Sequence, residues 1–401
     1  MTARLGSCAP PLVIALVTAL TYAGSFDGAF VADDLPAVRG NELIRSLAPA
    51  NLAAIFTSFD DANYVPLKVL SLAVDYRLWG PGPAGFHFTN LLLHVLSALL
   101  VHRILLRLEL GALPALGVAL LWAVHPLQVE SVAWISERKN VLSGFFFFGA
   151  FVAYLAWSES GRAAHYVALL VLYALALLSK MNTVVLPAVC LAYEVTFRWR
   201  LRRRDWLASL PLFALGALVV WFNLDGNPVH GRRYHGGSAI VTGLTSAVML
   251  MRYLRNTVLP TDLSWWYGRE NLLRDSALDP VVLLSLLGLA AIAAATIWSI
   301  RTRRPAAFWL LWFGITLAPM LNLIPFPSLI QDRYMYLPLL GLLVLAANAL
   351  QAAMRRGAPR WAIGSLAVAA ILACAVLSFQ RVEVFDTPES LRRDWEARRH
   401  R

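Results

Sequence analysis

Long stretches of apolar residues that carry no charge recur along the whole chain, and they constrain its fold more than any other feature. Several of them reach or approach the roughly 17 to 25 residues that a helix needs to cross the hydrocarbon core of a bilayer. Of the 401 residues, 59% are hydrophobic and 15% are charged, whereas a soluble globular domain has about 45–50% apolar and about 25% charged residues. The sequence therefore predicts an all-α polytopic membrane protein.

The length and charge of these stretches predict about eleven membrane spans. The first stretch could instead be a cleavable signal sequence, but the Tyr-Ala-Gly-Ser that ends it is a poor cleavage site. A retained helix is therefore favoured. The predicted spans lie at residues 10–26, 88–108, 112–125, 141–157, 165–178, 183–197, 206–224, 280–300, 306–322, 335–352 and 361–379.

Three short connections rich in arginine, at residues 198–204, 301–304 and 355–356, indicate the orientation of the chain. Basic loops remain on the cytoplasmic side of a membrane. We therefore expect a cytoplasmic N-terminus, an outer segment at residues 27–87 and an outer C-terminus. Arginine far outnumbers lysine, which favours a bacterial source and hence the bacterial plasma membrane.

One further apolar stretch, at residues 243–260, is interrupted by Arg252 and Arg255. If it spanned the membrane, the basic loop at 301–304 would face outward, against the rule that placed the other two. An interfacial or re-entrant helix keeps all three basic loops on one side. We therefore predict that this stretch does not span.

The charge and the motifs of the chain exclude several classes of function. A net charge of +11 would suggest nucleic-acid binding in a soluble protein, but here the basic residues flank apolar stretches, as membrane topology requires. The sequence has no glycine-rich nucleotide motif. Its three cysteines lack metal or disulfide spacing, and its histidines form no zinc motif. We expect neither a nucleic-acid partner nor a metal site.

The outer segment is too long for a plain connection, and we expect it to contain two helices lying on the membrane. Residues 64–79 have the spacing of an amphipathic helix. Its apolar face is formed by Leu67, Leu70, Val74 and Leu78, and a second face by Lys68, Ser71 and Asp75. A simple lid on the membrane surface would account for this pattern.

An acidic pair, Asp33-Asp34, follows the first predicted span by only a few residues and is flanked by apolar residues. Ionisable groups at the membrane are costly and are candidates for function. The alternative is that the pair merely marks the end of the helix. We favour the functional interpretation.

Basic residues on the outer face oppose the topological rule, and four of them precede helices that run inward. The N-terminal ends of such helices, together with arginine or lysine, are suited to hold a phosphate. The alternative is that each side chain reaches toward lipid head groups. The four candidates for an anion site are Arg138, Lys139, Lys180 and Arg333.

Several motifs, in order along the chain, resemble the transmembrane and TPR repeat-containing O-mannosyltransferases, which belong to the GT-C superfamily. The most specific is the block at 125–140, His-Pro-Leu-Gln-Val-Glu-Ser-Val-Ala-Trp-Ile-Ser-Glu-Arg-Lys-Asn. The other matches are Phe-Val-Ala-Asp-Asp at 30–34, Gly-Phe-His-Phe-Thr-Asn at 85–90, Leu-Ser-Lys at 178–180 and Gln-Asp-Arg-Tyr-Met-Tyr-Leu-Pro at 331–338. The resemblance implies a GT-C-like transmembrane domain over residues 1–380 and a short outer tail over 381–401.

The resemblance also implies a reaction: transfer of mannose or another hexose from a polyprenyl phosphate to a serine or threonine hydroxyl of an exported protein, with inversion. A carboxylate of Asp33 or Asp34 would accept the hydroxyl proton, and the four cations would stabilise the leaving phosphate. The scheme needs no nucleotide and no obligatory metal, although a carboxylate pair could bind a divalent ion. Further candidate site residues in the matching blocks are His125, Glu137 and Asp332.

The chain also departs from the family pattern. Val65 stands where the family usually has arginine, Met181 stands where an acid commonly follows the lysine, and no 34-residue repeat precedes Arg401. Acceptor recognition could then be supplied by a separate protein, or the acceptor could be a lipid or an envelope glycan. A non-catalytic scaffold or transporter is a third interpretation, but the sequence has no pair of broken helices in corresponding halves.

Overall fold

The computed structural model describes residues 2–60, 63–199, 201–225, 234–268, 272–322 and 328–398. Within these ranges the chain is helical, apart from turns and one isolated bridge between Asp60 and Asn63. It divides into two compact units. The first comprises Met1–Thr183 and Ala346–Leu391, and the second comprises Val184–Leu345 and Arg392–Arg401.

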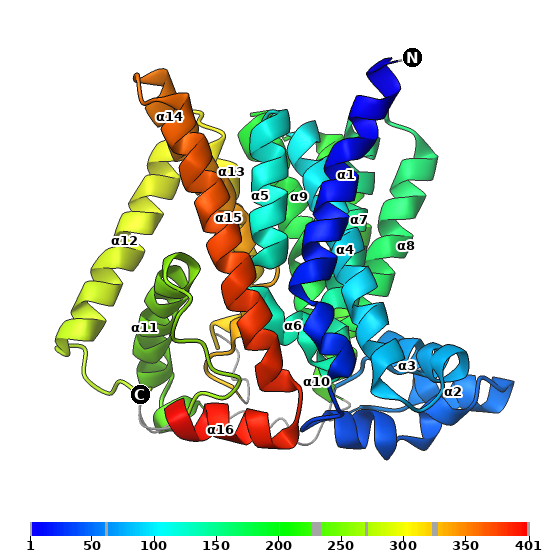
Figure 1. Cartoon of the computed structure of the whole chain (residues 1–401). Helices are drawn as coiled ribbons and strands as arrows, with labels where there is room; N and C mark the ends of the chain where they lie inside the picture. Colours follow the sequence, from blue (N-terminus) through cyan, green and yellow to red (C-terminus); the bar gives the residue numbers. More distant parts are fainter. Residues whose placement is uncertain are drawn as a thin grey trace. The chain divides into compact units, whose positions relative to one another are not determined.

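The first unit is built on long apolar helices that pack side by side (Figure 1). The helix α7 packs against α4 and α8, and α5 packs against α1, α4 and α15. Gly161 ends α7 in the left-handed conformation, with φ 68°, and its N–H donates to the Trp157 carbonyl at 2.7 Å, as a glycine C-cap does. The helices are α1 (Thr2–Thr21), α4 (Pro83–Arg107), α5 (Ala112–Val124), α7 (Arg138–Ser160), α8 (Ala163–Ser179) and α15 (Arg360–Val382).

The second unit has a similar construction. In it α13 packs against α9 and α12, and α12 also packs against α11. A Cβ added at Gly341 would lie 2.6 Å from the Trp309 carbonyl oxygen, so only glycine allows this approach. The helices are α9 (Leu186–Phe197), α10 (Arg203–Asp225), α11 (Ala239–Val258), α12 (Pro280–Arg301) and α13 (Ala306–Leu317), and α14 (Leu339–Arg355) leads back to the first unit.

The described helices agree in position with the predicted spans. Five are long and apolar enough to cross a membrane, Ala112–Val124 and Pro126–Ala133 form a bent pair at 51°, and five more are apolar but shorter. Each predicted span overlaps one of these, whereas α11 is not among them. The chain is thus a helical polytopic membrane protein, and the count of eleven spans stays a prediction. The five long helices are Pro83–Arg107, Ile135–Ser160, Arg203–Leu224, Pro280–Arg301 and Arg360–Phe385.

The segment between α1 and α4 contains two α-helices, as predicted: α2 (Pro49–Thr57) and α3 (Pro66–Trp79). Three short helical turns precede them, η1 (Ala23–Asp27), η2 (Leu35–Arg39) and η3 (Glu42–Arg45). In Figure 1 these elements gather at one end of the first unit. They share a hydrophobic core that also takes in Phe86 of α4 and Ile135. This segment is therefore a packed structure joined to α4 and to the turn that contains Ile135.

The helix α3 does not divide into a polar and an apolar side as its spacing predicts. Its predicted polar face is buried together with Val69 and Leu72, and part of its predicted apolar face is exposed. Lys68 and Asp75 are 3% and 2% exposed, whereas Val74 and Leu78 are 38% and 65% exposed. Burying ionisable groups is costly unless they are paired. The polar face of α3 must therefore meet partners inside the unit, so α3 is more than a lid.

Candidate functional site

The acidic pair lies in the turn that leads from η1 into η2. Asp34 is completely buried, and its carboxylate accepts three hydrogen bonds. Oδ1 accepts from the backbone N–H and from the hydroxyl of Ser136, each at 2.6 Å, and Oδ2 accepts from the Val31 N–H at 3.1 Å. Burial raises the pKa of Asp34 to about 6, although these hydrogen bonds and the positive charge of Lys68 oppose the shift.

Asp33 differs from its neighbour because it is exposed. The residue before it, Ala32, has φ 46°, in the left-handed region that costs a residue with a Cβ about 1–2 kcal/mol. Such strain persists only where the surroundings fix the backbone. Here they do, because Asp34 is bound to Ser136 and the Trp134 indole N–H donates to the Val31 carbonyl at 3.3 Å. The loop that exposes Asp33 is thus held in place by Asp34 and Val31.

The block at 125–140 supplies the rigid support for this loop. It forms the short helices η4 (Pro126–Gln128), α6 (Val129–Ala133) and η5 (Ile135–Glu137) and then enters α7. His125 is 1% exposed, and its Nδ1 accepts from the Leu127 N–H at 3.2 Å. This bond caps η4, so the candidate His125 serves the backbone turn. The tail after α15 also contacts the loop, since the Ala29 N–H donates to the Asp386 carbonyl at 2.7 Å.

Three of the predicted site residues form an ionic cluster at the start of α7. The Glu137 carboxylate is buried and lies 3.3 Å from Lys139 Nζ and 3.8 Å from Lys180 Nζ. Lys180 Nζ also donates to Asn140 Oδ1 at 2.7 Å. The side chains of Lys139 and Lys180 are 18% and 13% exposed. Two partly accessible cations therefore share one buried carboxylate.

Arg138 has a different environment from its neighbour Lys139. Its guanidinium is fully buried and donates to Asp75 Oδ2 at 2.6 Å, to the Phe86 carbonyl at 2.8 Å and to Asn90 Oδ1. Arg138 was predicted from the sequence as a phosphate ligand, but this position favours a structural role. The pair joins α3 to α7, and the Phe86 carbonyl adds α4.

Asp75 is the counter-charge of Arg138, and it also accepts from the Thr89 hydroxyl at 2.7 Å. Burial raises its pKa, against the lowering effects of Arg138 and Thr89. Asn90, the other partner of Arg138, donates to the carbonyls of Val132 and Trp134 at 3.2 and 3.1 Å. The network thereby fixes the backbone that carries Ser136.

Lys68 is a site residue that sequence reasoning missed. It is buried on α3, its Nζ lies 2.6 Å from Asp60 Oδ2, and its charge lowers the pKa of Asp34. The available signal was the shared helix face of Lys68 and Asp75 in a chain with only three lysines. Without knowledge of which face is buried, that signal predicted only an interfacial helix.

Asp332 and Arg333 lie in the second unit. Asp332 is buried and accepts from the Tyr267 hydroxyl at 2.7 Å. Arg333 is half-buried, and its guanidinium lies 5.8 Å from the centre of the Tyr334 ring. Arg333 is predicted as a cation for the donor phosphate, and that assignment stays a prediction.

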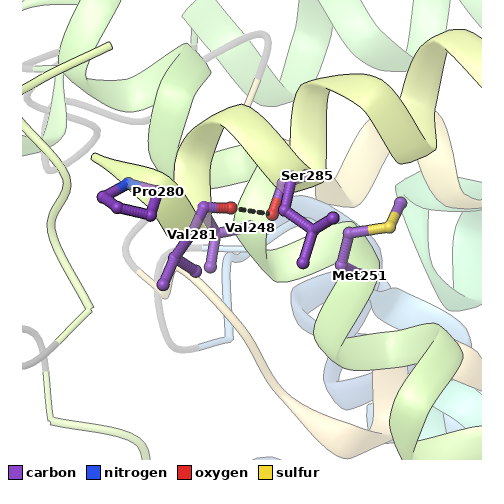
Figure 2. Close-up of a pocket in the computed structure, with 6 residues that line it drawn as sticks. Val248, Met251, Pro280, Val281 and Ser285 are labelled. Atoms are coloured by element: carbon purple, nitrogen blue, oxygen red, sulfur yellow. Dashed lines mark hydrogen bonds between the residues drawn. The ribbon is translucent and has the colours of Figure 1, made fainter. Parts of the chain in front are cut away.

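The second unit also has an apolar groove between α11 and α12 that encloses about 430 Å³. Figure 2 shows Val248 and Met251 of α11 facing the start of α12, where the Ser285 hydroxyl donates to the Val281 carbonyl at 2.7 Å. No ionisable side chain lines it. The groove suits contact with an apolar chain and holds no group for acid–base chemistry.

A metal centre has no ligand set in the part of the chain that the structure describes. No group of three or more histidine, cysteine, aspartate or glutamate side chains is close enough to hold an ion there. Within the same residues, the carboxylates of Asp34, Glu137 and Asp75 are engaged with Ser136, with lysines and with Arg138, respectively.

The fold has a counterpart among solved structures. It is the fold of ArnT from Cupriavidus metallidurans, whose crystal structure has undecaprenyl phosphate bound. The two match with a TM-score of 0.52 and 17% sequence identity, over 94% of this chain and 65% of that one. The predicted GT-C-like fold class is thereby confirmed, apart from the number of spans. No family model matches the chain.

Sequence similarity relates the chain to proteins of one named kind. The chain is 25% identical over 446 residues to the protein O-mannosyl-transferase Tmtc3 of Drosophila melanogaster, which covers 90% of this chain and 48% of that protein. It is 32% identical over 174 residues to TMTC4 of Mus musculus, covering 38% and 24%. For TMTC1 of Homo sapiens the values are 30% over 203 residues, covering 46% and 23%. The predicted resemblance is confirmed, and the chain spans about half or less of each relative.

Proposed function

We propose that the chain is a membrane glycosyltransferase that moves a hexose, with mannose as the first candidate, from a polyprenyl phosphate to a serine or threonine hydroxyl of an exported protein. One observation carries the proposal. A single turn, from Ser136 to Lys139, holds the acidic loop on one side and the lysine cluster on the other. Similarity to named O-mannosyl-transferases and the fold shared with ArnT support it.

Asp33 is the general base in this proposal. It is exposed, as a group that meets an acceptor hydroxyl must be, and Asp34 is buried and fully bonded. A carboxylate within hydrogen-bond reach of the hydroxyl lowers the barrier to attack by taking its proton. Asp34 then acts as a positioning residue, because its bonds to Ser136 and Val31 fix the loop that carries Asp33.

Lys139 and Lys180 stabilise the leaving group. The acceptor oxygen attacks the anomeric carbon, the bond from that carbon to the phosphate oxygen breaks, and the hydroxyl proton passes to Asp33. Attack opposite to the leaving group inverts the configuration. The departing phosphate gains negative charge, which nearby ammonium groups stabilise more in the transition state than in the ground state. No metal is needed to balance this step.

The orientation follows from the same proposal. With a cytoplasmic N-terminus, the loop that carries Asp33 and the start of α7 lie on the exoplasmic side of a bacterial plasma membrane, where exported acceptors arrive. The donor then enters from the bilayer and the acceptor from the aqueous side.

The test uses the full chain in proteoliposomes with a radiolabelled polyprenyl-phosphate hexose and a serine- and threonine-containing acceptor peptide. Asp33→Asn is expected to reduce transfer by about 100-fold or more, the scale of general-base catalysis. Glu389→Gln, a change at an exposed acid of α16 (Pro388–Arg398), serves as the matched control and should retain full transfer. Full transfer by Asp33→Asn would refute the assignment of the base.

The acceptor class needs a separate measurement. Mass spectrometry of envelope proteins, lipids and glycans from cells with and without the gene would identify which fraction loses a hexose. Loss of hexose from exported proteins is the expected result. Loss confined to lipids or glycans would refute the protein acceptor while leaving the transferase assignment intact.

A further inference from the structure

A polar pocket lies in the first unit, between α3 and the linker from η3 to α2, and its volume is about 310 Å³. It contains none of the residues assigned above to proton transfer or to the leaving phosphate. Its lining is basic at both sides and small or apolar between them: Arg45, Ser46, Leu47, Ala48, Ala73 and Arg77.

Neutral groups surround the two arginines in the part of the chain that the structure describes. Arg45 donates to the Tyr76 hydroxyl and to the Arg39 carbonyl, each at 2.6 Å, and its guanidinium lies 4.6 Å from the centre of the Tyr76 ring. All these partners are neutral, and they hold Arg45 in one position. Among the residues that the structure describes, neither Arg45 nor Arg77 lies within ion-pair distance of a carboxylate. Two guanidinium groups thus flank the pocket, and that of Arg45 is held by hydrogen bonds.

The surface beside the pocket is apolar. Val74, Leu78 and Trp79 are 38%, 65% and 49% exposed on α3. Ala73 and Arg77 are one turn apart on the same helix, so the pocket borders this apolar stripe directly. A helix that exposes an apolar stripe with a basic residue at its edge is typical of the membrane interface. The occupant of the pocket must therefore suit both a positive and an apolar surface.

We propose that this pocket binds the phosphate of an anionic membrane phospholipid, whose acyl chains cover the stripe formed by Val74, Leu78 and Trp79. Arginine donates to phosphate oxygens in fixed directions, and two guanidinium groups give the pocket the positive charge that attracts an anionic head group. Because Ala73 also packs in the core that contains Phe86 and Ile135, a bound lipid stabilises the outer segment against the helices beneath it. The proposal does not depend on sugar transfer.

The experiment measures thermal unfolding of the purified full chain in maltoside detergent with dihexanoyl phosphatidylglycerol, dihexanoyl phosphatidylcholine or inorganic phosphate. We expect phosphatidylglycerol to raise Tm, and we expect phosphatidylcholine and inorganic phosphate to have little effect. The double variant Arg45→Gln/Arg77→Gln should weaken the apparent affinity roughly 25-fold, the loss expected for two basic residues near a lipid head group. The matched control Arg392→Gln/Arg393→Gln removes two exposed charges from α16 and should bind normally.

Two outcomes overturn the proposal. An equal rise in Tm with phosphatidylcholine, or in the double variant, would show that the head group does not bind here. An equal rise with inorganic phosphate, unaffected by Val74→Ser/Leu78→Ser, would assign the pocket to a free anion. If the double variant does not fold, native mass spectrometry of the unmodified chain decides, because a specific site retains phosphatidylglycerol in preference to phosphatidylcholine.

Discussion

Both hydrogens that Ser136 can donate, from its backbone N–H and its hydroxyl, go to the same oxygen of Asp34, each over 2.6 Å. The bonds join residues that are 102 positions apart in the sequence, and they fix the strained loop that presents Asp33. Because both donors favour the charged carboxylate, they also limit the rise in the pKa of Asp34 that burial causes. The same two hydrogen bonds therefore fix the loop and influence the protonation of Asp34.

Ser136→Ala should shift the pH dependence of sugar transfer. Activity of the unmodified chain is expected to rise as pH increases through about 6, where Asp34 ionises and holds the loop most firmly. Removing a hydrogen bond to the carboxylate raises its pKa further, so the acidic limb of the variant should lie at higher pH while activity at high pH is retained. Unchanged acidic limbs in the two pH–rate profiles would contradict this role of Asp34.

Arg138→Gln should destabilise the fold rather than weaken donor binding. Removing one member of a buried ion pair leaves the other charge uncompensated, at a cost of about 3–5 kcal/mol. The double variant Arg138→Met/Asp75→Leu removes both charges and should recover part of that loss. Unfolding in detergent measures both effects. A stable Arg138→Gln protein with a raised KM for the donor would instead support the sequence-based prediction of a phosphate ligand.

Lys139→Gln and Lys180→Gln should each reduce kcat/KM for the donor by about 10- to 100-fold, the scale of a charged hydrogen bond. Both lysines are partly exposed, so the variants are expected to fold. Lys180→Arg retains the charge and should recover part of the activity. Steady-state kinetics with varied donor make the comparison. Normal kinetics in both glutamine variants would exclude the cluster from phosphate binding.

Membrane orientation can be tested with single cysteines in a variant that lacks the three native ones. A cysteine at Glu42, which is exposed on η3, should react from outside with an impermeant maleimide in spheroplasts. A cysteine at Arg356 should react only after the membrane is permeabilised. The reverse pattern would invert the predicted topology and place Asp33 on the cytoplasmic side.

The positions of the helices were predictable from the sequence, and the reason is physical. Membrane spans depend on local composition, so each predicted stretch overlaps a described helix. The choice of Asp34 as a candidate site residue also follows from its position in the sequence, close after an apolar helix. The burial of Arg138 does not, because its counter-charge Asp75 lies 63 positions away. Before the fold is known, a buried arginine and a ligand arginine at the start of a helix look alike.

The turn from Ser136 to Lys139 has a consequence for how this chain can vary. Three successive positions serve different partners: Ser136 binds Asp34, Glu137 pairs with Lys180, and Arg138 pairs with Asp75. Each added or deleted residue rotates a helical turn by about 100–120° and would exchange these partners at once. A substitution in this segment disturbs one contact, whereas a change in its length disturbs all of them. Homologous chains that share this chemistry should therefore align through the segment without a gap.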